Sequence, residues 1–162
     1  MTGLNNRNYI ESKIKAISNT KQLGILSLDL NGLKINNDYL GHDRGDYLLK
    51  SLAKEIKATF KDVAKKDIGR IGGDEFIIMM YDTDEALLKK KKHALMEACK
   101  KDRIEDTISV SIGSSYDANG TINIYALIQE ADANMYAMKD QTSNAYKNQL
   151  IEYIKLKDRF IR

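Results

Sequence analysis

Residues 68–81 read IGRIGGDEFIIMMY, and this stretch decides the fold. Two short apolar runs flank the pair Gly72-Gly73, which can adopt the positive φ angles of a tight hairpin. The second run, Phe76 to Met80, is apolar throughout, as is typical of a central strand covered on both faces. The sequence therefore predicts an antiparallel hairpin in the middle of a sheet, with Asp74 and Glu75 directly after its turn.

A second buried strand is predicted upstream of this hairpin. Residues 23–29 read LGILSLD, a short apolar run that ends on the carboxylate of Asp29. Acidic residues at the ends of neighbouring strands can converge on one point. We therefore expect Asp29 to lie close to Asp74 and Glu75.

The remaining segments show mainly helical periodicity. The predicted helices are 5–18, 48–60, 84–101, 122–139 and 145–161, with a further strand at 107–114 and a polar, glycine-punctuated stretch at 31–45. Helices that cover a mainly antiparallel central sheet indicate an α+β fold of ferredoxin or polymerase-palm type.

Length and composition describe an ordinary globular domain. The 162 residues suit one domain, and no repeat or linker divides them. The 26 basic and 23 acidic residues nearly balance, so we expect neither nucleic acid nor a membrane as a partner. The single cysteine, Cys99, cannot form an internal disulfide, and no apolar run approaches the ~20 residues of a membrane helix. A cytoplasmic location is the expectation.

The carboxylates of Asp29, Asp74 and Glu75 form a candidate metal site. Carboxylate oxygens are ligands that Mg²⁺ prefers, and two such ions can stabilise the attacking and leaving oxygens of a nucleotidyl transfer. The alternative is that these residues are ordinary turn carboxylates, because Asp and Gly favour turns in any case. Spacing alone leaves both interpretations open.

Two weaker signals point to a nucleotide. Residues 31–34 read NGLK and could present free backbone N–H groups to a phosphate at a helix start, with Gly32 allowing close approach. Asn37 and Asp46 pair an amide with a carboxylate. A carboxylate accepts from the guanine N1–H and N2–H₂ groups, which adenine lacks.

Together these stretches resemble the GGDEF domain family, bacterial diguanylate cyclase catalytic domains with a nucleotidyl-cyclase-like palm fold. Residues 70–76, RIGGDEF, contain the signature in full, and the similarity extends over about 140 residues. The other matching blocks, in order, are TGLNNR at 2–7, DLNGLK at 29–34 with ND at 37–38 and GHDRGD at 41–46, SVSIG at 109–113, and Ala131-Asp132 with Met135-Tyr136 and Lys139.

The resemblance implies a role for each matching position. Asp29, Asp74 and the Leu30 carbonyl would bind two Mg²⁺ ions, for which Mn²⁺ could substitute, and Glu75 would assist the metals or deprotonate the 3′-hydroxyl. Gly72 and Gly73 would let the hairpin approach the nucleotide. The residues expected to bind GTP are Asn37 and Asp46 for guanine, and the amides of Asn31, Gly32, Leu33 and Lys34 with the Lys34 and Lys139 side chains for phosphates.

The resemblance also implies partners and an architecture. Each domain would bind one GTP, so catalysis would require a face-to-face homodimer. A sensory or regulatory domain is expected in the full-length protein. We expect residues 1–162 to form one domain, with a core over about 2–144 and a C-terminal helix over 145–162.

The sequence departs from the family pattern at two functional positions. The inhibitory product site, R-x-x-D, would fall on Val63 and Lys66 or on Ala64 and Asp67, and neither pair supplies the arginine. No product inhibition at that site is expected. The phosphate-binding arginine that usually follows the closing lysine by four is replaced by Ser143, and Lys147 could substitute if the final helix brings it close.

Three functions are compatible with this pattern. The leading one is an active cyclase that makes cyclic di-GMP. The second is a non-catalytic module that binds GTP or cyclic di-GMP and acts by protein contact, which the change at Ser143 favours. The third is a related cyclase that uses ATP, which Asn37 and Asp46 disfavour.

Overall fold

The computed structural model describes residues 1–17 and 20–160. Its centre is a four-stranded antiparallel sheet in the order β2-β3-β1-β4. The strands are β1 (Leu23–Leu30), β2 (Lys66–Arg70), β3 (Glu75–Met80) and β4 (Val110–Asp117). The α+β fold with a mainly antiparallel sheet flanked by helices is therefore confirmed.

The hairpin predicted at residues 68–81 is present, and β3 is one of the two central strands. The expected turn chemistry is wrong, because neither Gly72 nor Gly73 has a positive φ angle. Four residues, 71–74, connect β2 to β3. A connection of this length can reverse the chain without the primed two-residue turn that requires positive φ.

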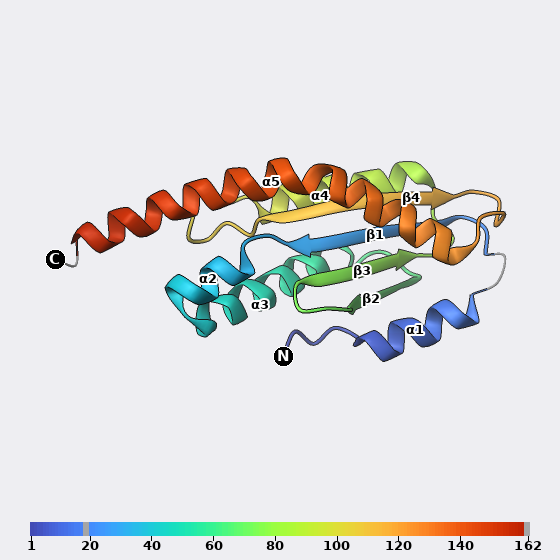
Figure 1. The fold of residues 1–162 in the computed structure, drawn as a ribbon. Coiled ribbons are helices and arrows are strands. Elements are labelled where there is room, and N and C mark those ends of the chain that lie inside the picture. The colour runs from blue at the N-terminus through green and yellow to red at the C-terminus, as the bar shows by residue number, and fades with distance from the viewer. Residues whose placement is uncertain (18–19, 161–162) are drawn as a thin grey trace.

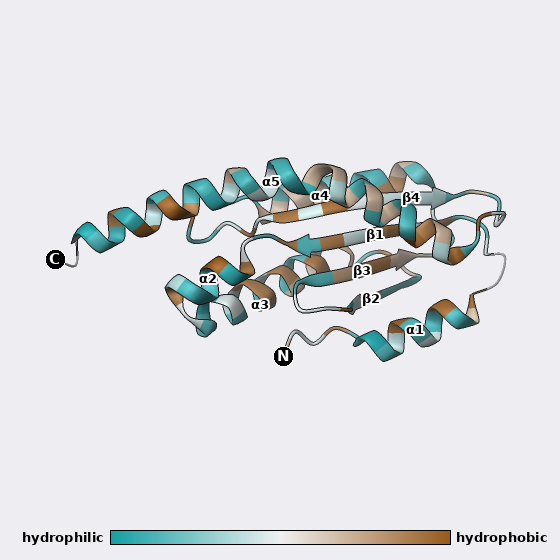
Figure 2. Ribbon diagram, viewed as in Figure 1, coloured by the Kyte–Doolittle hydropathy of each residue, from teal (hydrophilic) through white to brown (hydrophobic). Residues whose placement is uncertain are grey.

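The helices are α1 (Arg7–Ala16), α2 (Leu33–Leu40), α3 (His42–Thr59), α4 (Glu85–Cys99) and α5 (Ile124–Phe160). Successive side chains of β1 point to opposite faces of the sheet. Leu26 and Leu28 share one core cluster with α3 and α4, whereas Ile25 shares the other with α5 and α1. Figure 1 shows α5 lying along the sheet, and Figure 2 shows the apolar colouring concentrated on the strands and the helix faces turned toward them.

The two helices predicted at 122–139 and 145–161 are one continuous helix, α5, of 37 residues. The polar run from residue 140 to 144 suggested a break, but α5 contains neither glycine nor proline. Thr142 donates its hydroxyl to the Met138 carbonyl one turn earlier, and Tyr146 and Leu150 are buried beyond the run. Polar residues of this kind are tolerated within a helix when such contacts hold it.

The structure also differs from the prediction in the stretch after β1 and in the bounds of the last strand. The polar stretch at 31–45 contains the whole of α2 and the beginning of α3, and the last strand runs from Val110 to Asp117 rather than over 107–114. In the described ranges, no helix is long and apolar enough to cross a membrane.

Candidate active site

Of the three carboxylates predicted to converge, two do so at one end of the sheet: Asp29 and Asp74 lie close enough to interact, whereas the carboxylate of Glu75 lies against Gly72. Asp29, near the end of β1, stands directly opposite Glu75, the first residue of β3. The Leu30 amide donates to the Asp74 carbonyl over 2.8 Å, which fixes the turn beside β1. Arg70 holds the same turn from β2, since its guanidinium donates to the carbonyls of Gly72 and Gly73.

Asp29 is a buried carboxylate with one cationic partner. Only 3% of the residue is exposed, and its Oδ2 accepts a hydrogen bond from Lys139 Nζ of α5 at 2.8 Å. Burial raises the pKa of Asp29 and the neighbouring Asp74 carboxylate adds to this, while Lys139 and Lys147 oppose it. Burial acts to lower the pKa of Lys139, but the bond to Asp29 and its charge outweigh burial and raise it.

This donor set fits a divalent cation bound by hard oxygen ligands. Asp29 and Asp74 lie close enough for their charges to interact, and a cation between them would relieve that repulsion. An extended residue directs its N–H and C=O toward the same neighbouring strand. Since the Leu30 amide donates to the Asp74 carbonyl, the Leu30 carbonyl also points toward the turn that contains Asp74. No cluster of three His, Cys, Asp or Glu side chains with metal-binding spacing occurs in residues 1–17 and 20–160.

Asn31 serves to hold the loop after β1. Its backbone N–H donates to the Ser109 carbonyl at 2.8 Å, so this amide is occupied. Its side chain donates to Ser109 and accepts from the Ser111 hydroxyl, which also pairs with Thr142 of α5. The expected phosphate-binding amides are thereby narrowed to those of Gly32, Leu33 and Lys34.

Gly32 forms the start of α2 in a backbone conformation that favours glycine. Its φ is 72°, and an added Cβ would lie 2.7 Å from the Tyr146 ring. The first amides of a helix have no intrahelical acceptor and point out of its N-terminus. The amides of Leu33 and Lys34 are therefore directed as a phosphate site would need.

The two residues expected to bind guanine lie on α2 and α3, at a distance from Asp29 and Asp74. Asn37 packs its side chain against Gly45, and its Oδ1 is buried without a hydrogen-bond partner in the described part of the chain. Asp46, the next residue on α3, is exposed. A buried acceptor without a donor is costly in the free chain and is available to an N–H group of a ligand.

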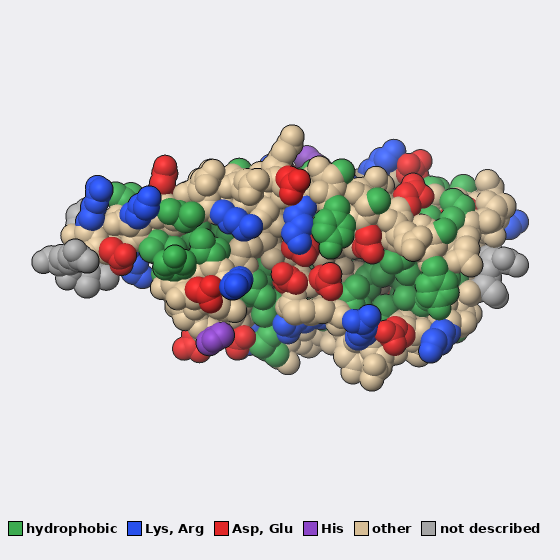
Figure 3. All heavy atoms as spheres, in the orientation of Figure 1, with side chains coloured by type: hydrophobic (Ala, Val, Ile, Leu, Met, Phe, Trp, Pro, Cys, Tyr) green, Lys and Arg blue, Asp and Glu red, His purple; other side chains and the backbone are tan. Residues whose placement is uncertain are grey.

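A cavity of about 340 Å³ joins the metal and phosphate parts of the site. It lies where acidic and basic side chains gather over the end of β1 and the start of β3 (Figure 3). Lys34, Lys139, Asp38 and Asp74 are among its charged lining residues. The full lining is Asp29, Leu30, Asn31, Gly32, Leu33, Lys34, Ile35, Asp38, Tyr39, Asp74, Lys139, Ser143 and Lys147.

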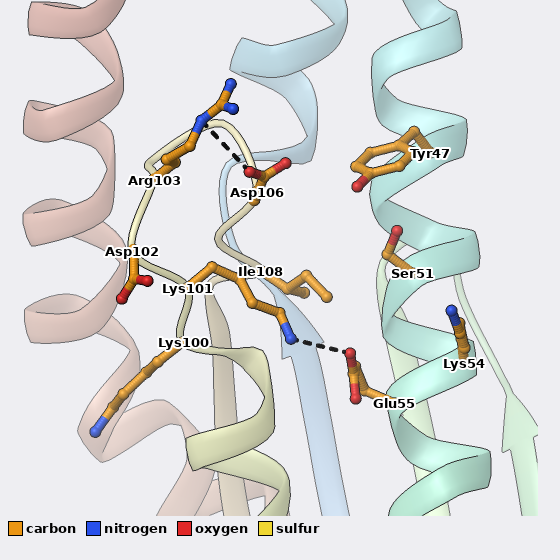
Figure 4. A pocket seen from close by; sticks show the side chains of 10 residues that line it. All are labelled: Tyr47, Ser51, Lys54, Glu55, Lys100, Lys101, Asp102, Arg103, Asp106 and Ile108. Atoms are coloured by element: carbon orange, nitrogen blue, oxygen red, sulfur yellow. Dashed lines mark hydrogen bonds and ion pairs between the residues drawn. The ribbon is translucent and has the colours of Figure 1, made fainter.

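A larger cavity, of about 500 Å³, lies between α3 and the loop that precedes β4. Its lining charges largely satisfy one another. Figure 4 shows the ion pairs of Lys101 with Glu55 and of Arg103 with Asp106. None of the predicted site residues lines it, so its size does not make it the functional site.

The sequence did not indicate the residues that pack behind the site and hold its backbone in place. Tyr146 lies against Gly32, and its hydroxyl accepts from Asn36 Nδ2 at 3.2 Å. The same Asn36 nitrogen donates to the Gly32 carbonyl, and Arg44 donates to Asn36 Oδ1. Arg70 stands two residues before the GGDEF signature, and the sequence assigned it no role. Gly72 and Gly73 indicated a turn, but no sequence pattern indicated that the Arg70 side chain would hold that turn.

A family model matches most of the chain, and the known proteins with similar sequences include diguanylate cyclases. Residues 1–145 match the family model described as "Diguanylate cyclase, GGDEF domain". The bifunctional diguanylate cyclase/cyclic di-GMP phosphodiesterase MucR of Pseudomonas aeruginosa is 34% identical over 90% of this chain and 22% of its own length. The diguanylate cyclase DgcS of Shewanella oneidensis is 31% identical over 91% of this chain and 51% of its own.

A solved structure shares the fold. The coiled coil and GGDEF domain of DgcB from Caulobacter crescentus, in complex with c-di-GMP, superposes with a TM-score of 0.73 at 21% identity, covering 86% of this chain and 78% of that one. The chain spans between about a fifth and a half of the curated relatives named above. The family match covers most of the chain and includes the site, and the chain therefore belongs to the GGDEF domain family of diguanylate cyclases.

Proposed function

We propose that the chain is the catalytic domain of a diguanylate cyclase, which condenses two GTP molecules into cyclic di-GMP and releases two pyrophosphates. The observation that carries this proposal is the proximity of Asp29 and Asp74 at one sheet end, beside a helix start, with Glu75 opposite Asp29 in the strand register. A buried Asp29 with a raised pKa is costly to keep ionised, and a bound cation offsets that cost. An ordinary turn carboxylate would face water.

Each group in the site has a part in this reaction. Asp29, Asp74 and the Leu30 carbonyl would hold two Mg²⁺ ions, or Mn²⁺, which supply stabilisation of the attacking and leaving oxygens. Glu75 accepts the proton of the 3′-hydroxyl or orients the groups that do. The α-phosphorus forms a bond to the 3′-oxygen and loses its bond to pyrophosphate, once for each GTP.

The helix start and the hairpin position the nucleotide. The amides of α2 and the side chains of Lys34 and Lys139 bind the phosphates. Lys139 donates to Asp29 in the free chain, and it can turn from Asp29 to a phosphate when a bound cation neutralises the Asp29 carboxylate. Gly72 and Gly73 keep the hairpin bare where the nucleotide approaches. Asn37 and Asp46 bind the guanine edge, for which the unpartnered Oδ1 of Asn37 provides an acceptor.

The proposed chemistry requires two copies. One domain presents one GTP, so the 3′-hydroxyl on one copy must face the α-phosphate on the other. Residues 1–162 act as a single domain, within a longer cytoplasmic protein whose regulatory part controls dimerisation. The relatives MucR and DgcS are both longer than this chain.

A second candidate is a non-catalytic GGDEF module that binds GTP or cyclic di-GMP. The observation that favours it is Ser143, which is buried and uncharged where the family carries a phosphate-binding arginine. The site carboxylates argue against it, because a module acting only by contact does not require them.

The deciding experiment incubates the purified chain with GTP and Mg²⁺ and identifies products by chromatography. A concentration series and a fusion to a dimerising coiled coil test the need for two copies. The matched control carries Asp74→Asn and Glu75→Gln. We expect cyclic di-GMP from the wild-type chain, at a rate per molecule that rises with concentration, and at least about a hundredfold less from the control.

Measured GTP binding without product, even from the forced dimer, would overturn the enzyme and leave the binding module. Product made equally well from ATP would overturn the guanine assignment. Equal rates from the wild-type chain and the control would remove the carboxylates from the mechanism.

A further inference from the structure

The long helix α5 lines the candidate site beyond the residues that the family model matches. Lys139, Ser143 and Lys147 are spaced by four residues, which places them on one face of a helix. All three line the cavity that also contains Asp29 and Asp74. With a rise of about 1.5 Å per residue, Lys147 stands about 12 Å along the helix from Lys139.

Packing holds this part of α5 against the site. Tyr146 is 4% exposed and Leu150 is 0% exposed, so both side chains anchor the helix on the side facing the domain. Tyr146 touches the start of α2 directly, through its ring at Gly32 and its hydroxyl at Asn36. Lys147, between these anchors, therefore has its backbone fixed at the edge of the cavity.

Lys147 has no ion-pair partner among the residues that the structure describes. Lys139 is paired with Asp29, whereas no carboxylate forms an ion pair with Lys147 anywhere in residues 1–17 and 20–160. Its ammonium is nevertheless near enough to Asp29 to lower the pKa of that carboxylate. A cation at the mouth of a cavity, next to helix amides and a second lysine, is suited to a ligand with several negative charges.

We propose that Lys147 is a triphosphate-binding residue, and that it supplies from one helical turn further along α5 the positive charge that Ser143 cannot supply. This inference rests on the proposed binding of GTP at the same site. A lysine acts as a mobile point charge, so it tolerates a longer reach than a planar guanidinium pairing would. Lys147 binds the negatively charged β- and γ-phosphates of GTP and makes no contact with the guanosine.

The test measures the dissociation constants of GTP and of GMP by isothermal titration, with Ca²⁺ present so that turnover is suppressed. The variants are Lys147→Gln and Lys147→Arg, and the control is Lys155→Gln, an exposed lysine two turns further along the same helix. Lys147→Gln is expected to weaken GTP binding about 10- to 100-fold and GMP binding less than threefold. Lys147→Arg should restore most of the loss, and Lys155→Gln should change neither constant.

The outcomes separate this inference from the function on which it rests. A wild-type chain that binds no GTP overturns both. GTP binding that is unchanged in Lys147→Gln overturns the role of Lys147 alone. An equal loss for GMP and GTP overturns it as well, since a contact with the distal phosphates cannot weaken both ligands alike. Unfolding temperatures of all variants should agree within about 2 °C, because Lys147 is exposed.

Discussion

At the scale of single residues, the site is built around a carboxylate in an unfavourable place. Asp29 is surrounded by the sheet and by α5, and its partner is one lysine. Such a residue lowers the stability of the chain at neutral pH unless a cation is bound. Positions that cost stability in the free protein are commonly positions where activity is gained.

Asp29→Asn should therefore raise the unfolding temperature of the metal-free chain at pH 7.5. Because the folded-state pKa of Asp29 is raised above its ordinary value of 3.8, the stability linked to its protonation is fully present below about pH 4. That stability is lost as the pH rises through the folded-state value. The advantage of the variant should accordingly grow between pH 4 and pH 7.5.

Thermal unfolding in a chelating buffer at pH 4, 5.5 and 7.5 measures this difference. The matched control is Asp38→Asn, which changes an exposed carboxylate lining the same cavity. A variant that melts at or below the wild-type temperature at every pH would contradict the argument. Addition of Mg²⁺ should raise the melting temperature of the wild-type chain and not that of Asp29→Asn.

Residues that carry chemistry were predictable from the sequence, and residues that support them were not. Asp29, Asp74 and Glu75 stand next to strand ends that apolar runs reveal, and the first two do lie close together. Tyr146 and Asn36 meet across 110 residues of chain, and no local pattern encodes a contact of that kind. Their partnership depends on the whole course of α5.

At the scale of elements, the site depends on how closely α5 approaches β4. Gly113 of β4 faces α5 with no side chain between them, and an added Cβ would lie 2.0 Å from the Ala131 carbonyl oxygen and 2.2 Å from the Met135 nitrogen. Both neighbours belong to backbone, which cannot rotate away as a side chain could. The glycine therefore sets the distance at which Lys139 reaches Asp29.

Gly113→Ala is expected to destabilise the chain by about 3 kcal/mol or more, because the strand and the helix must separate. Urea unfolding followed by circular dichroism measures the change. The control is Gly73→Ala, since nothing lies within 4 Å of a Cβ placed there and its φ is not positive. That variant should unfold within about 0.5 kcal/mol of the wild type. A similar loss in both variants would contradict the close-approach argument.

The elements themselves were largely predictable, and their ends were not. The apolar runs revealed β1 and β3, and helical spacing revealed α1, α3 and α4. The continuity of α5 was missed because five polar residues in a row look like a loop when the partners of Thr142 and Tyr146 are unknown. Tertiary contacts, not local preference, decide such a segment.

At the scale of the whole molecule, α5 belongs to the domain for only part of its length beyond the family match. Figure 1 shows its last turns extending past the sheet. Tyr146 and Leu150 are buried, whereas the residues from Lys155 to Arg159 are exposed. We therefore expect the domain to continue past residue 145 and not to depend on the outermost turns.

Two shortened chains test this boundary. A chain ending at Ala145 loses Tyr146 and Leu150 and should lose more than about 4 kcal/mol of unfolding free energy, because two buried side chains are removed. A chain ending at Ile154 should remain within about 1 kcal/mol of the full chain. Urea unfolding distinguishes them. Equal stability of the two shortened chains would place the C-terminal part of α5 outside the fold.

The pairing of Asp29 with Glu75 restricts how this domain can change over evolutionary time. Side chains of a strand alternate between faces, so inserting or deleting one residue within β1 would turn Asp29 away from α5 and toward the core formed with α3 and α4. Replacements inside the strand can be accommodated one at a time, but changes of length cannot. Lineages descending from this chain should accumulate insertions in the segment between β4 and α5, and keep the lengths of β1 and β3 constant.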